Sequence, residues 1–386
     1  MNEEVIPYGR QNITEDDIRA VIATLQSDFL TQGPEISRFE DAFAKYTGSK
    51  YAVAVSNGTA ALHLCAMVLK VDRSSNVITS PITFAATANS IRYCSGNVFF
   101  ADIDPNTWTL DIEKVKGLIL SKPAGFFSGI ITVDLAGYPV NLEAFKNLAE
   151  QHGLWLLQDA CHSPGGFFTD SNNKKQSCGN SAYANLAIFS FHPVKHIACG
   201  EGGMIVTNDE KLYKELLLLR THGITKDHAM MEENHGGWYY EMQELGYNYR
   251  LTEFQASLGL SQLNRAEQGL ARRREIAKVY ADAFSDKPYI NGQSGSVVGH
   301  AYHLYVIRTA DRKGLYDFLK ENKVYCQVHY IPVHLLPYYR QLGWKNGDFP
   351  ESEKYYEECL SLPMFPTLTD AQQLHVINLV SAYFDK

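Results

Sequence analysis

Three short segments of the sequence combine reactive side chains with the ends of apolar runs. They are residues 56–61 (SNGTAA), 158–162 (QDACH) and 190–196 (SFHPVKH). Each lies at the end of a predicted strand, and in an open parallel sheet ligands collect at the carboxyl ends of the strands. We therefore expect the three segments to meet at one edge of one sheet.

Lys195 is the first candidate for chemistry. It lies two residues after Pro193 and shortly before Gly-Glu-Gly-Gly at 200–203. A Schiff base needs the neutral amine, and holding a lysine half-neutral at pH 7 takes about 4.6 kcal/mol relative to its ordinary pKa. Burial and a neighbouring cation can supply this. Taken alone, a loop lysine is more often a surface residue.

Asp159 ends the apolar run 154–159 (LWLLQD), so its carboxylate projects from a strand. A buried carboxylate without a cationic partner is costly. The protonated ring nitrogen of pyridoxal 5'-phosphate (PLP) is one such partner, and a structural ion pair or a helix cap is the alternative. His162 is placed to hydrogen-bond the phenolic oxygen of that cofactor or to cap the same turn.

Gly58 and Thr59 open a predicted helix directly after a strand, and the free N–H groups of such a start bind phosphate. Ser190 can add a hydroxyl from a neighbouring strand. Phe84 lies between a strand and a helix, where an aromatic ring can stack on a planar cofactor or simply belong to the core. The set of residues is more informative than any one of them.

The elements that position these residues alternate between strand and helix. Apolar runs at 51–56, 76–80, 98–102, 129–133, 154–159, 186–191 and 204–207 predict about seven strands, mostly parallel and separated by helices. The fold class is therefore α/β. A Gly-, His- and Tyr-rich stretch at 222–249 predicts a long functional loop. A helix over 252–284 then leads to a smaller C-terminal domain with strands at 302–307 and 324–328 and helices at 315–322 and 370–382. We expect a large domain over 1–250 and a small one over 251–386.

Composition excludes several classes. Net charge is −8 and no Lys/Arg block occurs, which disfavours nucleic acid and anionic membranes as partners. No apolar run approaches the length of a membrane span, and the N-terminal segment does not resemble a secretory signal. Seven scattered cysteines without a C-x-x-C pair indicate a reduced cytoplasm. The histidines form no metal-ligand pattern. His192 and His196 lie four residues apart, but Pro193 between them disfavours a helix that would place both on one face, so we expect no metal.

With these residues in hand, the chain resembles the DegT/DnrJ/EryC1/StrS aminotransferases, a sugar-modifying branch of fold-type I PLP enzymes. The resemblance runs from 30–34 (LTQGP) through the segments above to 246–253 (GYNYRLTE) and 329–334 (HYIPVH). The 190–196 segment most resembles the transaminases that make UDP-4-amino-4,6-dideoxy-N-acetyl-β-L-altrosamine on the route to pseudaminic acid. Cys161 departs from the usual Glu-Asp-Ala-Ala pattern, and no chemistry is assigned to it.

The resemblance implies roles for individual residues. Lys195 carries the cofactor and moves a proton, Asp159 pairs the ring nitrogen, and Phe84 stacks on the ring. Gly58, Thr59 and Ser190 hold the phosphate. Asn248 reaches the cofactor phosphate of a neighbouring subunit, which implies a homodimer. The residues expected to frame the nucleotide sugar are Tyr8, Asp28, Phe29, Leu30, Thr31, His329, Tyr330, Ile331 and Pro332.

The implied reaction moves an amino group from L-glutamate to C4 of a UDP-4-keto-6-deoxy-N-acetylhexosamine, in two ping-pong half-reactions. A PLP-dependent sugar dehydratase and an aminotransferase acting at C3 of another nucleotide sugar are the alternatives. Some relatives replace the lysine with histidine and dehydrate their sugar, and Lys195 argues against that. A non-enzymatic PLP-binding or regulatory protein is disfavoured, because the chain is acidic and the sequence has no helix-turn-helix pattern. A nucleotide-binding oxidoreductase would need a G-x-G-x-x-G turn, and the sequence has none.

Overall fold

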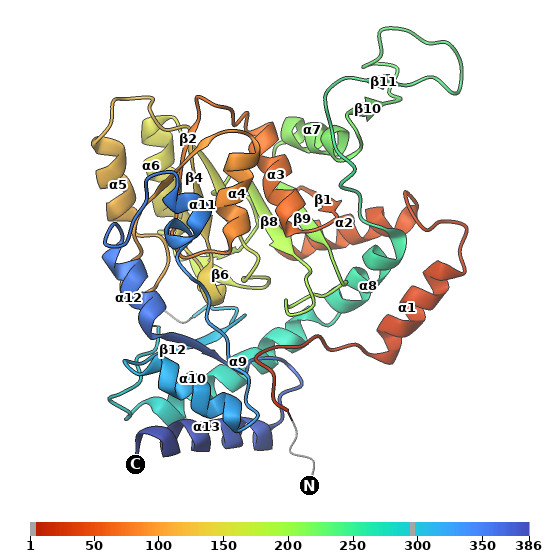
Figure 1. Ribbon diagram of the computed structural model, residues 1–386. Helices are drawn as coiled ribbons and strands as arrows, with labels where there is room; N and C mark the ends of the chain where they lie inside the picture. The colour runs from red at the N-terminus through yellow and green to blue at the C-terminus, as the bar shows by residue number, and fades with distance from the viewer. Residues whose placement is uncertain (1–4, 294–297, 386) are drawn as a thin grey trace.

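A seven-stranded sheet forms the centre of the larger domain (Figure 1). The computed structural model describes residues 5–293 and 298–385. In spatial order the strands are β1 (Tyr51–Val55), β9 (Gly203–Thr207), β8 (Leu186–Ser190), β5 (Trp155–Asp159), β4 (Gly129–Val133), β2 (Asn76–Thr79) and β3 (Asn97–Phe100). All seven predicted strands are present in this sheet, and the α/β fold is confirmed.

The sheet is parallel except for β9, which runs antiparallel to both neighbours, β8 and β1. The carboxyl ends of β1, β2, β5 and β8 therefore share one edge with the amino end of β9. This brings Gly203 against the turn after β1. A Cβ at Gly203 would lie 2.5 Å from the Asn57 carbonyl oxygen and 2.9 Å from the Gly58 nitrogen, so only glycine fits there.

Alternating side chains of each strand bury both faces of the sheet. On β9, Ile205 joins a core with α3 and α4, whereas Met204 and Val206 join a core with α2 and α8. A further core on that second side contains residues of α5 and α6. The helices of this domain are α1 (Glu15–Leu25), α2 (Pro34–Thr47), α3 (Gly58–Val68), α4 (Ala85–Tyr93), α5 (Ile112–Leu120), α6 (Leu142–His152) and α7 (Glu210–Arg220).

The smaller domain has its own core around a short antiparallel pair, β12 (Tyr305–Arg308) and β13 (Cys359–Leu362). Helices α9, α10 and α13 pack on it, together with Ile6 from the N-terminal segment. The remaining helices are α8 (Glu253–Leu263), α9 (Ala266–Phe284), α10 (Arg312–Glu321), α11 (Pro337–Arg340), α12 (Pro350–Glu358) and α13 (Asp370–Phe384).

Two expectations for the elements were wrong, and one pair of strands was not expected. The helix expected over 252–284 is two helices, α8 and α9, and at the break Arg265 pairs with the buried Asp17 of α1. Residues 324–328 form two isolated bridges, Ile6 with Val324 and Gln327 with Ser361, rather than a strand. A hairpin of β6 (Phe167–Thr169) and β7 (Lys175–Ser177) was not expected.

The loop over 222–249 leaves the body of the molecule as an arm (Figure 1). It contains the two-residue strands β10 (Ile224–Thr225) and β11 (Glu241–Met242). Trp238 and Leu245 are both 75% exposed on it. No helix in the described ranges, 5–293 and 298–385, is long and apolar enough to cross a membrane.

Candidate active site

A cavity of about 450 Å³ opens at the sheet edge where β1, β2, β5 and β8 end. It brings together most of the residues singled out from the sequence. The predicted residues that line it are Tyr8, Gly58, Thr59, Phe84, Asp159, His162, Ser190, Lys195, His329 and Tyr330. The expectation that the three chemical segments meet at one edge is therefore met.

Asp159 presents a buried carboxylate to this cavity. It is 6% exposed and accepts hydrogen bonds from the Thr87 hydroxyl at 2.8 Å and from the Cys161 amide at 3.2 Å. Among the described residues no cation forms an ion pair with it. A buried carboxylate with two hydrogen bonds and no countercharge is a place where a bound cation is stabilised.

The start of α3 lines the same cavity. Asn57 caps the helix, accepting from the Ala60 amide at 2.8 Å through its side chain and from the Ala61 amide at 3.1 Å through its carbonyl. This leaves the amides of Gly58 and Thr59 for an anion. A Cβ at Gly58 would lie 3.1 Å from the Ser190 Cβ, so glycine at 58 leaves room for a ligand to approach both the start of α3 and the end of β8.

The Lys195 amine meets one group in this cavity at hydrogen-bond distance, the Nε2 atom of His303, at 3.4 Å. Burial lowers the pKa of Lys195 below its ordinary value, and the buried cation Arg273 lowers it further. Asp159 and Cys161 act in the opposite direction. The amine thus has the surroundings that favour its uncharged, nucleophilic form.

His162 uses both ring nitrogens within the protein. Its Nδ1 accepts from the Ala136 amide at 3.2 Å, so a neutral ring carries its proton on Nε2, which lies 3.2 Å from the Tyr330 hydroxyl oxygen. Burial holds the pKa of His162 well below its ordinary value, which keeps the ring neutral. The Tyr330 oxygen therefore accepts from His162, and its own O–H is left to donate into the cavity.

Aromatic rings cover the mouth of the cavity. Phe84 is 61% exposed, and its ring centroid lies 6.1 Å from that of Tyr330. Tyr8 and His329 face each other with centroids 5.4 Å apart. The exposed Phe84 ring suits stacking on a planar ligand.

Other predicted residues lie outside this cavity within one chain. Asn248 is exposed at the base of the arm, where it bridges to Thr221. Residues 28–31 form an exposed loop whose Leu30 carbonyl accepts from the Glu253 amide at 3.0 Å. Ile331 is 47% exposed, and Pro332 is buried beside the cavity-lining Tyr330 without lining the cavity itself.

Sequence reasoning missed Thr87 and His303. Thr87 lies one helical turn after Thr83, and their hydroxyls are 2.8 Å apart. A hydroxyl in the first turn after Phe84 was a usable signal for a carboxylate partner. His303 comes from the smaller domain, just before β12, and no local pattern relates it to Lys195.

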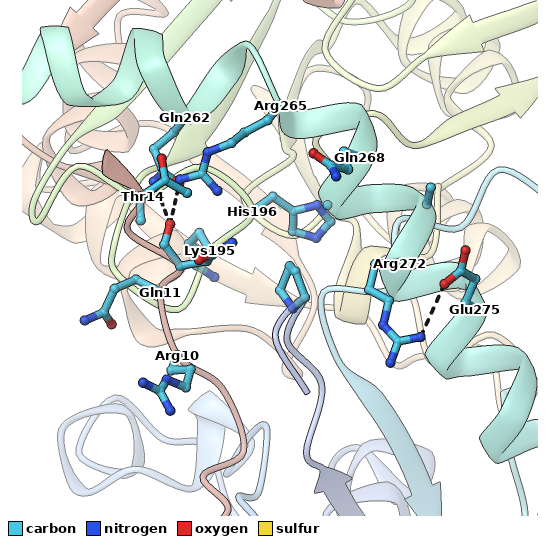
Figure 2. A pocket seen from close by; sticks show the side chains of 15 residues that line it. Arg10, Gln11, Thr14, Lys195, His196, Gln262, Arg265, Gln268, Arg272 and Glu275 are labelled. Atoms are coloured by element: carbon cyan, nitrogen blue, oxygen red, sulfur yellow. Dashed lines mark hydrogen bonds and ion pairs between the residues drawn. The ribbon is translucent and has the colours of Figure 1, made fainter. Parts of the chain in front are cut away.

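A second cavity, of about 540 Å³, lies between the N-terminal segment and the α8–α9 junction (Figure 2). Lys195 lines this cavity as well. Two of its three arginines, Arg265 and Arg272, are already paired, with Asp17 and Glu275. Neither the buried carboxylate nor the start of α3 lines it, so it lacks the groups that a PLP site needs.

The first cavity fits PLP. It offers a carboxylate without a countercharge for the ring nitrogen, free helix-start amides for the phosphate, an amine of lowered pKa, and an exposed ring for stacking. No three His, Cys, Asp or Glu side chains of the described chain gather as a metal site would require.

Buried histidines around the site predict acid sensitivity. Burial lowers the pKa of His300 and of His329 to about 3. Each stays neutral in the fold but takes up a proton in the unfolded chain below its ordinary pKa, near 6.5. Stability is therefore full above that pH and falls as the pH drops toward 3, by about 2 kcal/mol per histidine at pH 5.

Urea unfolding at pH 7.5, 6 and 5 measures this loss. The variant His300→Asn removes one titrating group and should lose less stability between pH 7.5 and 5 than the wild type. Equal free energies of unfolding at the three pH values would contradict the prediction.

Comparison with known proteins identifies relatives over nearly the whole chain. The model of the DegT/DnrJ/EryC1/StrS aminotransferase family matches residues 11–381. Uncharacterized protein MJ1066 of Methanocaldococcus jannaschii is 37% identical over 98% of this chain and 98% of its own. Spore coat polysaccharide biosynthesis protein SpsC of Bacillus subtilis is 36% identical over 97% of this chain and 96% of its own.

Solved structures agree. PseC of Helicobacter pylori, an aminotransferase involved in the biosynthesis of pseudoaminic acid, superimposes with a TM-score of 0.88 at 29% identity, covering 99% of this chain and 100% of its own. Spr1654 of Streptococcus pneumoniae in its PLP form gives a TM-score of 0.89 at 26% identity, covering 98% of both chains.

Proposed function

The chain belongs to the DegT/DnrJ/EryC1/StrS aminotransferase family, and from this premise we propose that it moves an amino group from L-glutamate to C4 of a UDP-4-keto-6-deoxy-N-acetylhexosamine. The chain is a PLP-dependent sugar aminotransferase, since its family and its structural neighbours are. The observation that carries the proposal is the placement of the Lys195 amine and the Asp159 carboxylate, the latter without a countercharge, in one cavity. The likeness to PseC supports the choice of sugar.

Bound PLP supplies an electron-withdrawing ring that stabilises negative charge at the substrate carbon. In our proposal Asp159 keeps the ring nitrogen protonated, and Thr87 and the Cys161 amide hold the carboxylate in place. The Lys195 amine carries the proton between substrate and cofactor. The amides of Gly58 and Thr59 and the Ser190 hydroxyl bind the phosphate.

The sugar nucleotide is proposed to enter over Phe84, between the Tyr8–His329 pair and Tyr330. The Tyr330 hydroxyl, whose oxygen accepts from His162, donates to an oxygen of the substrate. Residues 28–31 are exposed on their own chain. They are therefore proposed to act on a neighbouring subunit.

Product analysis tests this function. The protein is incubated with L-glutamate and a panel of keto-sugar nucleotides that differ in nucleotide and keto position, and the products are identified by mass spectrometry. We expect the C4-keto UDP sugar to gain an amine in step with 2-oxoglutarate formation. Loss of water from the sugar without any donor would indicate a dehydratase. Amination at C3 alone would refute the proposed position.

A homodimer with shared sites is proposed from Asn248, which is exposed and lies outside its own cavity. Mixing two inactive or weakened variants, Lys195→Ala and Asn248→Ala, tests it. A mixed dimer has one site with Lys195 from one chain and Asn248 from the other, so activity should recover to roughly half that of the wild type per mixed dimer. Neither variant alone should show this recovery. Absence of recovery after unfolding and refolding the mixture would contradict a shared site.

We also propose a cytoplasmic location. All seven cysteines are free in the structure, as a reducing compartment favours.

A further inference from the structure

The buried side of Lys195 carries a contact that the proposed mechanism does not use. Its amine lies 3.4 Å from Nε2 of His303, a long but feasible hydrogen bond. His303 is 3% exposed and comes from the segment that leads into β12 of the smaller domain. One catalytic group of the large domain is thus held by a side chain of the small one.

The unused nitrogen of His303 indicates which partner donates. Its Nδ1 is buried and has no hydrogen-bond partner in the described part of the chain. If the amine donated to Nε2, the ring would carry its proton on Nδ1, as a buried N–H without an acceptor, which is rare in folded proteins. If Nε2–H donates instead, Nδ1 holds only an unused lone pair. The second arrangement requires the amine to accept, so the amine must be uncharged.

A buried cation, Arg273, contacts the backbone of His303. Arg273 is 1% exposed, and its guanidinium donates to three backbone carbonyls, those of Tyr302 at 3.2 Å, His303 at 3.1 Å and Met364 at 3.1 Å. No carboxylate among the described residues forms an ion pair with it. Arg273 therefore both anchors the backbone of His303 and presents positive charge that a second cation nearby would oppose.

The groups around the amine act in both directions. Burial and Arg273 oppose a charge on Lys195, whereas Asp159 and Cys161, at the end of β5, favour one. The neighbouring imidazoles are kept neutral by burial, their pKa values lying below the ordinary value; they are His162, His196, His303 and His329.

We propose that His303 is a positioning residue for Lys195, donating from Nε2 to the uncharged amine, and that Arg273 fixes His303 in this role. The inference rests on the proposed role of Lys195 in carrying the cofactor. It adds that the small domain, through one imidazole, holds the nucleophile of the large domain ready to react.

The reactivity of the amine itself is the test, measured on the full chain after cofactor removal. Trinitrobenzenesulfonate labels neutral amines, and mass spectrometry of the Lys195 peptide gives labelling as a function of pH. His303→Phe keeps the burial but loses the donor, so the midpoint pH should rise by roughly 0.5 to 1 unit. His303→Gln, which keeps an N–H, should restore most of the shift. Arg273→Met should raise the midpoint and Arg273→Lys should not.

His334→Phe is the matched control. His334 is also a fully buried histidine with an unpartnered Nδ1, but it pairs with Glu353 away from the site, so the Lys195 midpoint should stay unchanged. An unchanged or lowered midpoint in a folded His303→Phe protein overturns the proposal, because a donating amine would lose its acceptor and become easier to deprotonate.

A second measurement reads the histidine protons of the wild-type protein directly and needs a variant only to assign the signals. Nitrogen-15 NMR of labelled histidines, with His303→Gln for assignment, reports which ring nitrogen carries the proton. We expect Nε2 to be protonated, and protonated Nδ1 refutes the arrangement. Both measurements work without a sugar, so failure to aminate the proposed substrate would leave them unaffected.

Discussion

Replacing Lys195 with alanine is expected to lower the transamination rate by about 10⁴-fold or more, because in the proposed function this one side chain both attaches the cofactor and carries the proton. The amine lines the cavity, has a lowered pKa and contacts His303 at 3.4 Å. Cofactor should still bind through the start of α3, but the visible absorption that reports its bond to lysine should be lost. Steady-state rates and absorption spectra of the purified variant measure the two effects.

Two controls sharpen this experiment. Lys174→Ala removes an exposed lysine of the β6–β7 hairpin and should change neither rate nor spectrum. Added methylamine should restore part of the rate to Lys195→Ala, because a free amine can occupy the space of the lost side chain. Near-normal turnover by Lys195→Ala would remove the basis of the proposed function.

Asp159→Asn is expected to lower the rate by roughly 10²- to 10³-fold, since it removes the charge proposed to face the cofactor ring while keeping the shape of the side chain. The hydrogen bonds that hold the side chain can survive the change. Asparagine can still accept from the Cys161 amide, and the Thr87 hydroxyl can turn to accept from it, because Thr83 offers a second oxygen 2.8 Å away. The effect should therefore fall on chemistry and cofactor retention rather than on folding.

Thr87→Val separates the orientation of the Asp159 carboxylate from its charge. It leaves the carboxylate charged but removes the neutral hydrogen bond that orients it, so we expect only about a fivefold loss. Cofactor dissociation constants and single-turnover rates separate the two variants. Equal losses in Asp159→Asn and Thr87→Val would mean that position, and not charge, is what the carboxylate contributes.

The sheet was predictable because its strands are buried on both faces. Runs such as 129–133 are buried throughout and mostly apolar, and the turns that follow them carry most of the polar residues. The shared edge then follows from parallel pairing, and it places Asp159 and Lys195 together. The antiparallel direction of β9 could not be predicted in this way, because an apolar strand of five residues has the same pattern in either direction.

The break between α8 and α9, and the site residues that come from distant parts of the chain, could not be predicted from the sequence. The apolar periodicity of 252–284 continues across Asn264, whereas at the break Arg265 pairs with Asp17 of α1, a tertiary contact that no local pattern shows. His303 likewise joins Lys195 only through the packing of two domains. The proposed roles of Asn248 and of residues 28–31 depend on another subunit, and a single chain cannot display them.

The reversed strand β9 has a consequence for how related sequences must vary. Gly203 touches the backbone of Asn57 and Gly58, not their side chains, so no change of side chain at 57 or 58 can make room for a larger residue at 203. A descendant that loses this glycine has to remodel the main chain of the turn after β1 in the same evolutionary step. In an alignment, such a loss should therefore coincide with an insertion or deletion near residue 57.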